Sequence, residues 1–411
     1  MSRASGSAPR VFLGWHVVAA AFAITFLGFG SAYTFGSFLE PLQKEFGASR
    51  GSVSLVFSLA GFLYFAFGFV SGPLADRWGV RKLAAGGMTL IGLGLILAGR
   101  AHTLLQVYAA YSLGVGLGVG CAYVPTLGAV QRWFVKRRGV ASGLAVSGIG
   151  VGTLVMPPFA TWLIDHLQWR STYLVLGILV IALGLAAAFV MADEPASHNQ
   201  HPDGLPPDAN APPHPREGIS VREAVRTGTF RSLYIACLIG SLGVFVPFLH
   251  LVPYAMEHGI SVTGGVWLLS AIGIGSTIGR FFLGGIADKI GRERFLVGMY
   301  LGMAASLAIW VLSATLAMLI VFAVVFGLFY GGWVAILPAI VADFFGAKNV
   351  GAIIGILYTS VAIGTLVGPS GAGYLYDLSH SYFMSIAASA AASAVAAAVT
   401  LAAVMRPPVK T

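Results

Sequence analysis

Charged residues are scarce in this sequence. Asp, Glu, Lys and Arg make up 9% of the 411 residues, and hydrophobic residues make up 57%. A soluble domain carries about 25% charged residues, so the composition excludes an ordinary soluble protein. The chain instead contains twelve apolar stretches near or above the roughly 20 residues that a helix needs to cross a bilayer. Most of the chain is therefore expected to lie in a membrane.

Cysteine is almost absent, and no catalytic cluster stands out. The two cysteines, Cys121 and Cys237, fall inside predicted helices, which excludes a disulfide framework and a cysteine-based metal site. The glycine-rich runs are not followed by the Lys-Ser/Thr of a phosphate-binding loop. Because no nucleophile–base pair or metal cluster is present either, we expect neither an enzyme nor a bound cofactor.

The apolar stretches predict an all-α membrane protein with two helical domains. A segment rich in Pro, His, Asp and Asn separates the sixth span from the seventh and is typical of a mobile linker. We expect an N-terminal bundle over residues 1–192, a linker over 193–229 and a C-terminal bundle over 230–411. The predicted spans cover residues 13–39, 51–75, 82–100, 104–130, 138–164, 170–192, 230–256, 263–287, 294–312, 314–342, 350–376 and 382–405.

The basic residues are unevenly distributed between the two sides of the membrane. Lys44, Arg50, Arg100 and Arg170 fall on one side and Arg280 falls inside a span, whereas every other Lys and Arg falls in the tails and loops of the opposite side. Basic loops stay in the cytoplasm, so both termini are predicted to be cytoplasmic, with the protein in the inner membrane. The net charge of +9 is thus a topology signal and does not indicate nucleic-acid binding.

Two sequence patterns occur twice at the same spacing. Residues 72–82 (GPLADRWGVRK) match residues 284–294 (GGIADKIGRER), and residues 152–165 (GTLVMPPFATWLID) match residues 364–377 (GTLVGPSGAGYLYD). Both pairs are 212 residues apart. This common offset predicts two six-helix halves in parallel repeat, related by an axis along the membrane normal.

One cation is buried deep in the predicted eighth span. Arg280 lies eight residues before Asp288, which opens a charged loop, so the arginine is about 12 Å inside the hydrocarbon. A guanidinium at that depth costs a few kcal/mol and cannot lose its proton. No acidic residue is predicted at a similar depth, so we expect a small carboxylate ligand to pair with it. Arg280 therefore indicates a transporter of such anions.

The chain resembles the Major Facilitator Superfamily over nearly its whole length, because the repeated loop at 72–82 and 284–294 is that superfamily's signature. The resemblance implies twelve helices in two pseudo-symmetric bundles that rock about a central site. It also implies that the loop residues clasp helix ends on the cytoplasmic side when the site opens outward. These predicted gating residues are Asp76, Arg77, Arg81, Asp288, Lys289 and Arg292.

Within the superfamily, the monocarboxylate transporter family is the most similar. Residues 133–148 (WFVKRRGVASGLAVSG) resemble that family's entry to helix 5, and Gly14-Trp15 resembles its helix-1 motif. The related oxalate/formate antiporters share the helix-8 arginine. Animal monocarboxylate transporters carry an Asp where this chain has Ser276 and a Lys where it has Tyr33, and the antiporters carry a Lys near Val361. With one fixed positive charge, the resemblance favours a monocarboxylate over a dianion such as oxalate.

Several polar and aromatic residues are candidates for the ligand site around Arg280. In this superfamily helices 1, 4, 7 and 10 line the cavity, and a phenol suits a small hydroxy- or alkyl-carboxylate. Any single one of these aromatic residues is more often packing than a ligand contact, and Ser276, one turn from Arg280, could bond only its own backbone. His250 could bind the ligand or carry a proton, or simply bond a freed backbone carbonyl. The predicted substrate-binding residues are Arg280, His250, Tyr33, Ser276, Tyr330, Tyr123, Tyr358 and Trp333.

We therefore expect a monomeric transporter of a lactate- or pyruvate-like monocarboxylate. Proton symport is implied by the resemblance, with His250, or the substrate together with Arg280, as the proton carrier. Two alternatives stay open: carboxylate exchange of the oxalate/formate type, and a sensor that binds a carboxylate without moving it.

Overall fold

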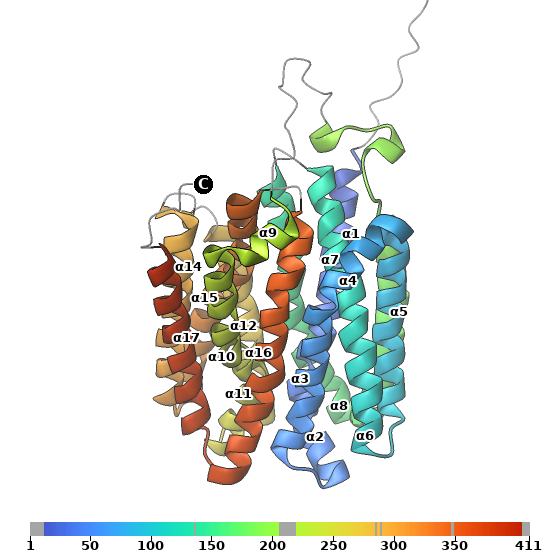
Figure 1. The fold of residues 1–411 in the computed structure, drawn as a ribbon. Helices are drawn as coiled ribbons and strands as arrows, with labels where there is room; N and C mark the ends of the chain where they lie inside the picture. Colours follow the sequence, from blue (N-terminus) through green and yellow to red (C-terminus); the bar gives the residue numbers. More distant parts are fainter. Residues whose placement is uncertain are drawn as a thin grey trace, which may run out of the picture.

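The computed structural model describes residues 12–134, 137–204, 219–283, 286–287, 290–346 and 349–404. Every element in this part of the chain is a helix, which confirms the all-α prediction. The long helices run side by side, and α1 begins at the same end of the bundle at which α17 stops (Figure 1). We call this end the termini side and the opposite end the far side.

The N-terminal half contains six membrane crossings. The fifth and sixth lie in one 53-residue helix, because no loop intervenes and the chain reverses at Gln168, whose backbone has φ 65° and ψ 160°. The elements of this half are α1 (Gly14–Tyr33), α2 (Phe35–Phe46), α3 (Arg50–Ala66), α4 (Gly68–Trp78), α5 (Val80–Gly99), α6 (Leu104–Val107), the π-helical stretch η1 (Tyr108–Leu117), α7 (Gly118–Trp133) and α8 (Arg138–Val190).

The C-terminal half repeats this arrangement. The described residues contain eleven helical segments long and apolar enough to cross a membrane, and one of them, Val140–Val190, is the double crossing of α8. The twelve predicted crossings are thereby confirmed. The elements of this half are α10 (Gly228–Val244), α11 (Val246–Glu257), α12 (Val262–Phe282), α14 (Arg292–Val311), α15 (Leu316–Phe345), α16 (Val350–Ser379) and α17 (Phe383–Val404).

Short helices occur within the predicted linker, of which residues 205–218 lie outside the described part. They are η2 (Ala196–His198), η3 (Pro202–Gly204) and α9 (Val221–Arg226). The last begins with a capping box, in which the Ser220 hydroxyl accepts from the Glu223 amide and the Glu223 carboxylate accepts from the Ser220 amide. Such a reciprocal pair satisfies two amides that a helix start leaves free, and its Ser-x-x-Glu pattern is visible in the sequence.

The first crossing is longer than predicted. The sequence suggested residues 13–39, whereas α1 and α2 together reach Phe46, where Gly47 ends the helix in a left-handed conformation (φ 58°). The added turns are amphipathic and carry a Glu40–Lys44 ion pair one turn apart, so they extend past the apolar run from which the span was predicted.

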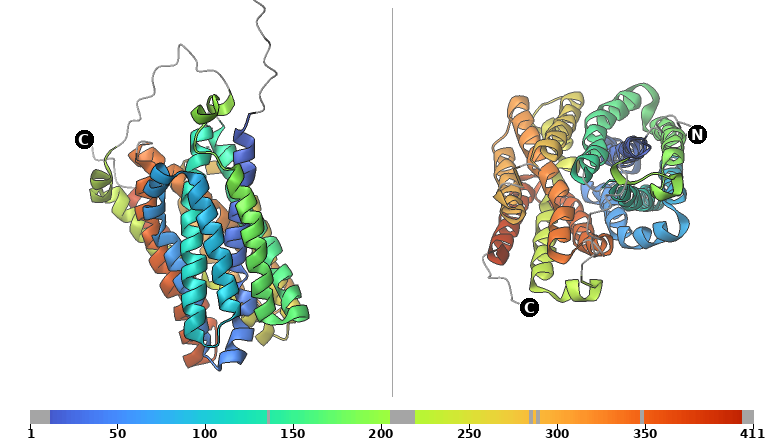
Figure 2. Two further views of the ribbon diagram at one scale, coloured as in Figure 1. Left: turned by 90° about the vertical axis from the view of Figure 1, so that its right-hand side faces the viewer. Right: turned by 90° about the horizontal axis from the view of Figure 1, so that it is seen from above.

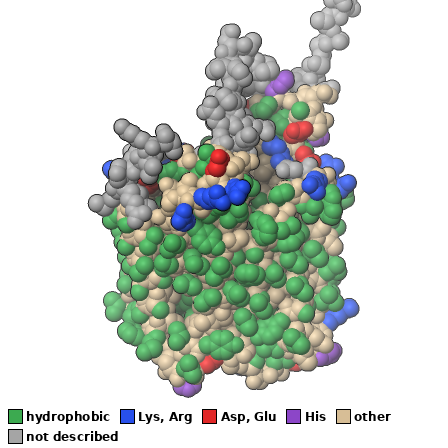
Figure 3. Space-filling model, in the orientation of Figure 1, with side chains coloured by type: hydrophobic (Ala, Val, Ile, Leu, Met, Phe, Trp, Pro, Cys, Tyr) green, Lys and Arg blue, Asp and Glu red, His purple; other side chains and the backbone are tan. Residues whose placement is uncertain are grey.

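Apolar side chains cover the side of the bundle, and Lys and Arg side chains gather mainly at the termini side (Figure 3). Among the apolar residues that face outward are Leu97, Phe189 and Trp267, each more than half exposed. An outward apolar surface of this extent would be unfavourable in water and is the surface expected of a protein in lipid.

The two halves meet along two seams in which glycines bring opposing backbones close together. One seam joins α8 to α12, where a β-carbon added to Gly150 would lie 3.2 Å from the Gly273 carbonyl oxygen. The other joins α3 to α16, where a β-carbon on Gly373 would lie 2.8 Å from the Cα of Gly51. Seen from above, the halves lie next to each other as two groups of helices (Figure 2). Glycine at these positions lets the helices of opposite halves approach closely.

Candidate functional site

Arg280 on α12 is a buried cation of the C-terminal half. Its side chain is 4% exposed, and none of its three guanidinium nitrogens has a hydrogen-bond partner among the described residues. A guanidinium has five N–H donors and cannot become neutral, so leaving all of them unpaired is costly. The arrangement therefore suits an anion that arrives from outside the chain.

Tyr330 on α15 lies next to this cation. The guanidinium carbon of Arg280 is 5.7 Å from the centroid of the Tyr330 ring, within the range of a cation–π contact. The two helices are close because they meet through glycine: a β-carbon on Gly279 would lie 2.2 Å from the Leu328 carbonyl oxygen, and one on Gly331 would lie 2.2 Å from that of Ser276. Local sequence thus sets the distance between the cation and its aromatic neighbour.

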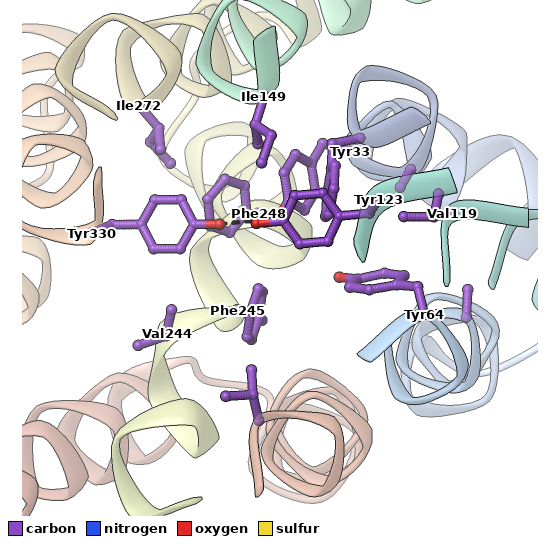
Figure 4. Packing of buried hydrophobic residues seen from close by; sticks show 14 of the residues in the cluster. Tyr33, Tyr64, Val119, Tyr123, Ile149, Val244, Phe245, Phe248, Ile272 and Tyr330 are labelled. Atoms are coloured by element: carbon purple, nitrogen blue, oxygen red, sulfur yellow. Dashed lines mark hydrogen bonds between the residues drawn. The ribbon is translucent and has the colours of Figure 1, made fainter. Parts of the chain in front are cut away.

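Tyr33 extends the group into the N-terminal half. Its hydroxyl oxygen is 3.0 Å from that of Tyr330, and its ring stacks on Phe248 with centroids 4.5 Å apart. Figure 4 shows the rings of both tyrosines beside Phe248 and Tyr123, between helices of the two halves. Residues on α1, α11 and α15 therefore meet at one point of the interface beside Arg280.

Other predicted tyrosines lie in the same aromatic cluster. Tyr123 on α7 packs edge-on against Phe29 at 4.9 Å, and Tyr358 on α16 packs edge-on against Phe65 at 5.8 Å. Both are buried. These contacts place both rings in the aromatic wall beside Arg280.

Sequence reasoning missed Tyr64 on α3. The residue is fully buried, its hydroxyl has no partner among the described residues, and its ring lies 5.5 Å from Phe29. Figure 4 shows it in the same cluster as Tyr33 and Tyr123. A buried phenol normally finds a partner, so this unused hydroxyl is a further candidate for a ligand contact. The sequence signal was only a tyrosine among apolar residues at mid-span.

Ser276 and Trp333 each carry a buried polar atom without a partner in the described part of the chain. Ser276 lies one turn before Arg280, and its hydroxyl is not used by its own helix in this structure. The ring of Trp333 lies 6.3 Å from the rings of both Tyr330 and Tyr300. Trp333 thus packs between the site and the interior of the C-terminal half.

His250 is fully buried on α11, and both of its ring nitrogens are bonded. Nε2 lies 2.8 Å from the Pro369 carbonyl oxygen, and Nδ1 lies 3.2 Å from the Tyr382 hydroxyl. Because a carbonyl can only accept, Nε2 carries the hydrogen and Nδ1 accepts from Tyr382 when the imidazole is neutral. A carbonyl partner was anticipated as one of two possibilities for this histidine, although Pro369 on α16 was not foreseen.

Two of the predicted gating residues, Arg81 and Arg292, contact helix ends on the termini side. The Nε of Arg81 donates to the Met191 carbonyl at 3.1 Å, and Arg292 pairs with Asp343 at 2.7 Å. Arg77 is exposed. Asp288, Lys289 and the side chain of Asp76 lie outside the described part. The gating role of this set stays a prediction.

The second charge found in relatives has no substitute at the positions where they carry it. Tyr33 is bonded to Tyr330, and Val361 is an apolar residue buried on α16. The described residues contain no group of three His, Cys, Asp or Glu that could hold a metal ion. Arg280 thus remains the fixed charge of the aromatic cluster.

Comparison with known proteins agrees with this architecture. The sequence pattern of the Major Facilitator Superfamily matches residues 21–279 and 232–411. The chain is 28% identical over 388 residues to monocarboxylate transporter 11 of Homo sapiens, covering 92% of this chain and 80% of the relative. It is 26% identical over 392 residues to monocarboxylate transporter 12-B of Danio rerio, covering 90% and 82%. It is also 27% identical to MFS-type transporter 1 of Ophiocordyceps sp., covering 89% and 79%.

A solved structure has the same fold. It is a bacterial homolog of the human lysosomal transporter Spinster, which superimposes with a TM-score of 0.69 at 18% identity and covers 97% of this chain and 98% of that one. The fold, the repeated loop and the family match lead to one conclusion: the chain is a multi-pass membrane transporter, not an enzyme, and belongs to the Major Facilitator Superfamily.

Proposed function

We propose that this protein transports a small monocarboxylate of the lactate or pyruvate kind, with Arg280 as the residue that binds the carboxylate. The observation that carries the proposal is the buried guanidinium whose nitrogens all lack partners among the described residues. A planar fork of donors matches a carboxylate bidentately, and pairing removes most of the cost of the buried charge.

The single cation supports a monoanion as substrate. A dianion at this site would keep one carboxylate without a charged partner, because Tyr33 and Val361 stand where relatives supply a lysine. The hydroxyls of Ser276, Tyr64 and Tyr330 could bond a carbonyl or hydroxyl group beside the carboxylate. The relatives named as monocarboxylate transporters point to the same class of anion.

The transport cycle is alternating access in a monomer. The two halves rock about the central site, as parallel repeats in this superfamily allow. The asymmetry of Lys and Arg supports a cytoplasmic termini side and an inner-membrane location, with the far side facing away from the cytoplasm.

Proton symport is the favoured mode, with His250 as the proton carrier. One proton moving with one monoanion makes the cycle electroneutral, so the membrane potential does not oppose uptake. When His250 is neutral, its Nδ1 is the nitrogen that can take up a proton. Among the described residues, Nδ1 has one side-chain hydrogen-bond partner, Tyr382. Exchange of one carboxylate for another is the second candidate, since the oxalate/formate antiporters share the helix-8 arginine.

The test is uptake of labelled L-lactate into proteoliposomes by Arg280→Ala and by a matched control. Arg170→Ala is the control, because Arg170 pairs with Glu45 at 2.9 Å inside the N-terminal half, away from the aromatic cluster. We expect the rate of lactate uptake to fall at least about tenfold in Arg280→Ala, because the variant lacks the charge-assisted hydrogen bonds to the carboxylate. Equal uptake by Arg280→Ala and wild type would refute the assignment.

Symport and exchange are separated by two loading conditions. Symport predicts net uptake into empty vesicles driven by an inward proton gradient. Exchange predicts uptake only when the vesicles are preloaded with a carboxylate, irrespective of that gradient. A panel of short carboxylates in a thermal-shift assay then ranks the preferred acid.

A further inference from the structure

A cluster at the far side joins the two halves through Arg50, the first residue of α3. Its guanidinium donates to the Glu257 carboxylate at 2.6 Å and to the Tyr382 hydroxyl at 2.8 Å. It also lies over the Tyr376 ring, 4.0 Å from the centroid. Arg50 belongs to the N-terminal half and all three partners belong to the C-terminal half, so one side chain spans the interface.

A second C-terminal residue holds the backbone at the same place. The Asp377 carboxylate at the end of α16 accepts from the backbone amides of Arg50, at 3.2 Å, and Gly51, at 2.9 Å. These amides begin α3 and have no partner within their own helix. An acceptor from the opposite half thus caps an N-terminal helix, and separating the halves at this end would uncover both amides.

Arg50 is also connected to His250 through Tyr382. The Pro369 carbonyl fixes the hydrogen of His250 on Nε2, so the Tyr382 hydroxyl donates to Nδ1 and accepts from Arg50. Burial raises the pKa of the Tyr382 hydroxyl, so it keeps its hydrogen at all relevant pH values. The hydrogen bonds therefore run in one direction, from Arg50 to Tyr382, from Tyr382 to His250, and from His250 to Pro369.

This direction is incompatible with a protonated His250. An imidazolium donates from both nitrogens, so Nδ1–H and the Arg50 guanidinium would both be aimed at the oxygen of Tyr382. The hydrogen of Tyr382 would lose its acceptor, and two cations would share one hydroxyl. His250 makes hydrogen bonds to Tyr382 and Pro369. Other titratable groups lie near this series of hydrogen bonds but do not bond to His250: Tyr254, Glu257, Tyr376 and Asp377.

We infer that the Arg50 cluster is the outer gate of the transporter, and that Tyr382 couples this gate to the protonation of His250. The cluster holds the far side closed while His250 is neutral. A proton on His250 reverses the Tyr382 hydroxyl, weakens the contact to Arg50 and favours opening to the outside. In this scheme Arg50 and Tyr382 are positioning residues. The inference rests on the alternating access and the proton carrier proposed above.

The gate can be tested by spin-label distances, without any substrate. Cys121 and Cys237 are replaced by Ala, and labels are attached at His102→Cys and Ala314→Cys, two exposed far-side positions in opposite halves. We expect Arg50→Ala to raise the ratio of long to short distances by about tenfold, the size of a 1.4 kcal/mol change. Glu257→Gln, which keeps the shape and removes the charge, shifts the ratio in the same direction. Lys44→Ala leaves it unchanged, because its ion pair with Glu40 lies within α2.

The proton link is tested by the same measurement at several pH values. In the parent protein, acid pH increases the long-distance population. The response disappears in His250→Gln, whose amide can donate to Pro369 and accept from Tyr382 but cannot gain a proton. It also disappears in Tyr382→Phe. An unchanged distribution in both Arg50→Ala and Glu257→Gln overturns the gate, and a pH response that survives in His250→Gln overturns the coupling.

Failure of the carboxylate proposal is distinguishable from failure of this one. If the label distances shift as described but the protein does not transport lactate, the gate proposal is supported and the substrate proposal is rejected. Arg280-dependent lactate uptake combined with unchanged distances does the reverse.

Discussion

The hydroxyl oxygens of Tyr33 and Tyr330 lie 3.0 Å apart and form a hydrogen bond between the two halves of the transporter. Tyr330 also lies beside Arg280, so this bond is directly next to the proposed carboxylate site. Where Tyr330 is the donor of this bond, a ligand that accepts from Tyr330 competes with Tyr33 for the same hydrogen. Binding of substrate is therefore expected to alter a contact between the halves.

The position of Tyr33 offers a direct test of charge selectivity. Tyr33→Lys would place a second cation near Arg280, because Tyr33 is bonded to Tyr330, which lies beside Arg280. We expect affinity for oxalate relative to lactate to rise by at least about tenfold, because both carboxylates would then have a charged partner. Competition of unlabelled oxalate against labelled lactate uptake measures the change.

Tyr33→Phe is the matched control for that substitution. It removes the hydroxyl bond to Tyr330, a loss of about 1 kcal/mol, without adding a charge. The preference for lactate should persist in Tyr33→Phe. A shift toward oxalate in both variants would mean that loss of the tyrosine pair, and not the added charge, sets selectivity.

Replacing Arg280 should stabilise the protein when no ligand is present. Arg280→Met removes a buried cation whose nitrogens are unpaired in the described structure and keeps most of its volume. We expect a gain of about 2 kcal/mol in the free energy of unfolding, together with loss of any stabilisation by lactate. Thermal unfolding in detergent, with and without lactate, measures both effects.

The opposite result has a clear meaning. If Arg280 stabilised the fold through bonds to the protein itself, Arg280→Met would be less stable than the parent. His250→Gln serves as the comparison, because it keeps a donor and an acceptor at a residue that is already bonded on both sides. The free energy of unfolding should change less in His250→Gln than in Arg280→Met.

Much of the fold could be predicted from the sequence because its signals are regular. The apolar runs gave the twelve crossings, and the two matched patterns indicated the repeat. The errors lie at helix ends, where the controlling contacts are local. The last turns of α2, up to Phe46, are amphipathic, so a search for apolar runs ends before them. At Gln168 the chain reverses within one residue where a loop was expected, and the hydrophobic periodicity does not reveal such a reversal.

The candidate site could be predicted only in part. Arg280 was identifiable because a cation at mid-span is costly wherever it points. Tyr64 was not, since a single tyrosine in an apolar run is usually packing. The partners of His250 and Arg50 come from α11, α16 and the loop before α17, more than 100 residues away in sequence, so only tertiary structure reveals them.

The glycine contact behind Arg280 should be sensitive to one added carbon. In Gly279→Ala the new β-carbon would lie 2.2 Å from the Leu328 carbonyl, so α12 and α15 must separate. We expect a loss of about 1–3 kcal/mol in stability and weaker lactate binding, because Arg280 moves with its helix. Thermal unfolding and a binding titration measure the two effects.

Gly298→Ala is the control for helix propensity. Gly298 lies in α14, and an added β-carbon there meets nothing within 4 Å. Alanine is the better helix former by about 0.5–1 kcal/mol, so this variant should be as stable as the parent or more stable. Equal losses in the two variants would show that close helix approach is not the cause.

Symport of one proton with one monoanion fixes how uptake responds to the two driving forces. An inward proton gradient of one pH unit is worth about 1.36 kcal/mol and should raise the lactate accumulated at equilibrium about tenfold. A potential of about 100 mV would act on an unaccompanied anion with about 2.3 kcal/mol but should leave electroneutral uptake unchanged. Vesicles with imposed gradients measure both. Accumulation that follows the potential would exclude the one-to-one ratio.

The paired glycines between α8 and α12, and between α3 and α16, affect how cheaply the protein can change shape. At Gly150 and Gly373 an added β-carbon would lie within 3.2 Å of the opposite backbone, so fewer side chains have to separate there during a turnover than in a fully interlocked interface. The two seams therefore let one half move against the other at small cost in free energy. Most of the free-energy difference between the conformations then comes from the polar contacts at the ends of these helices.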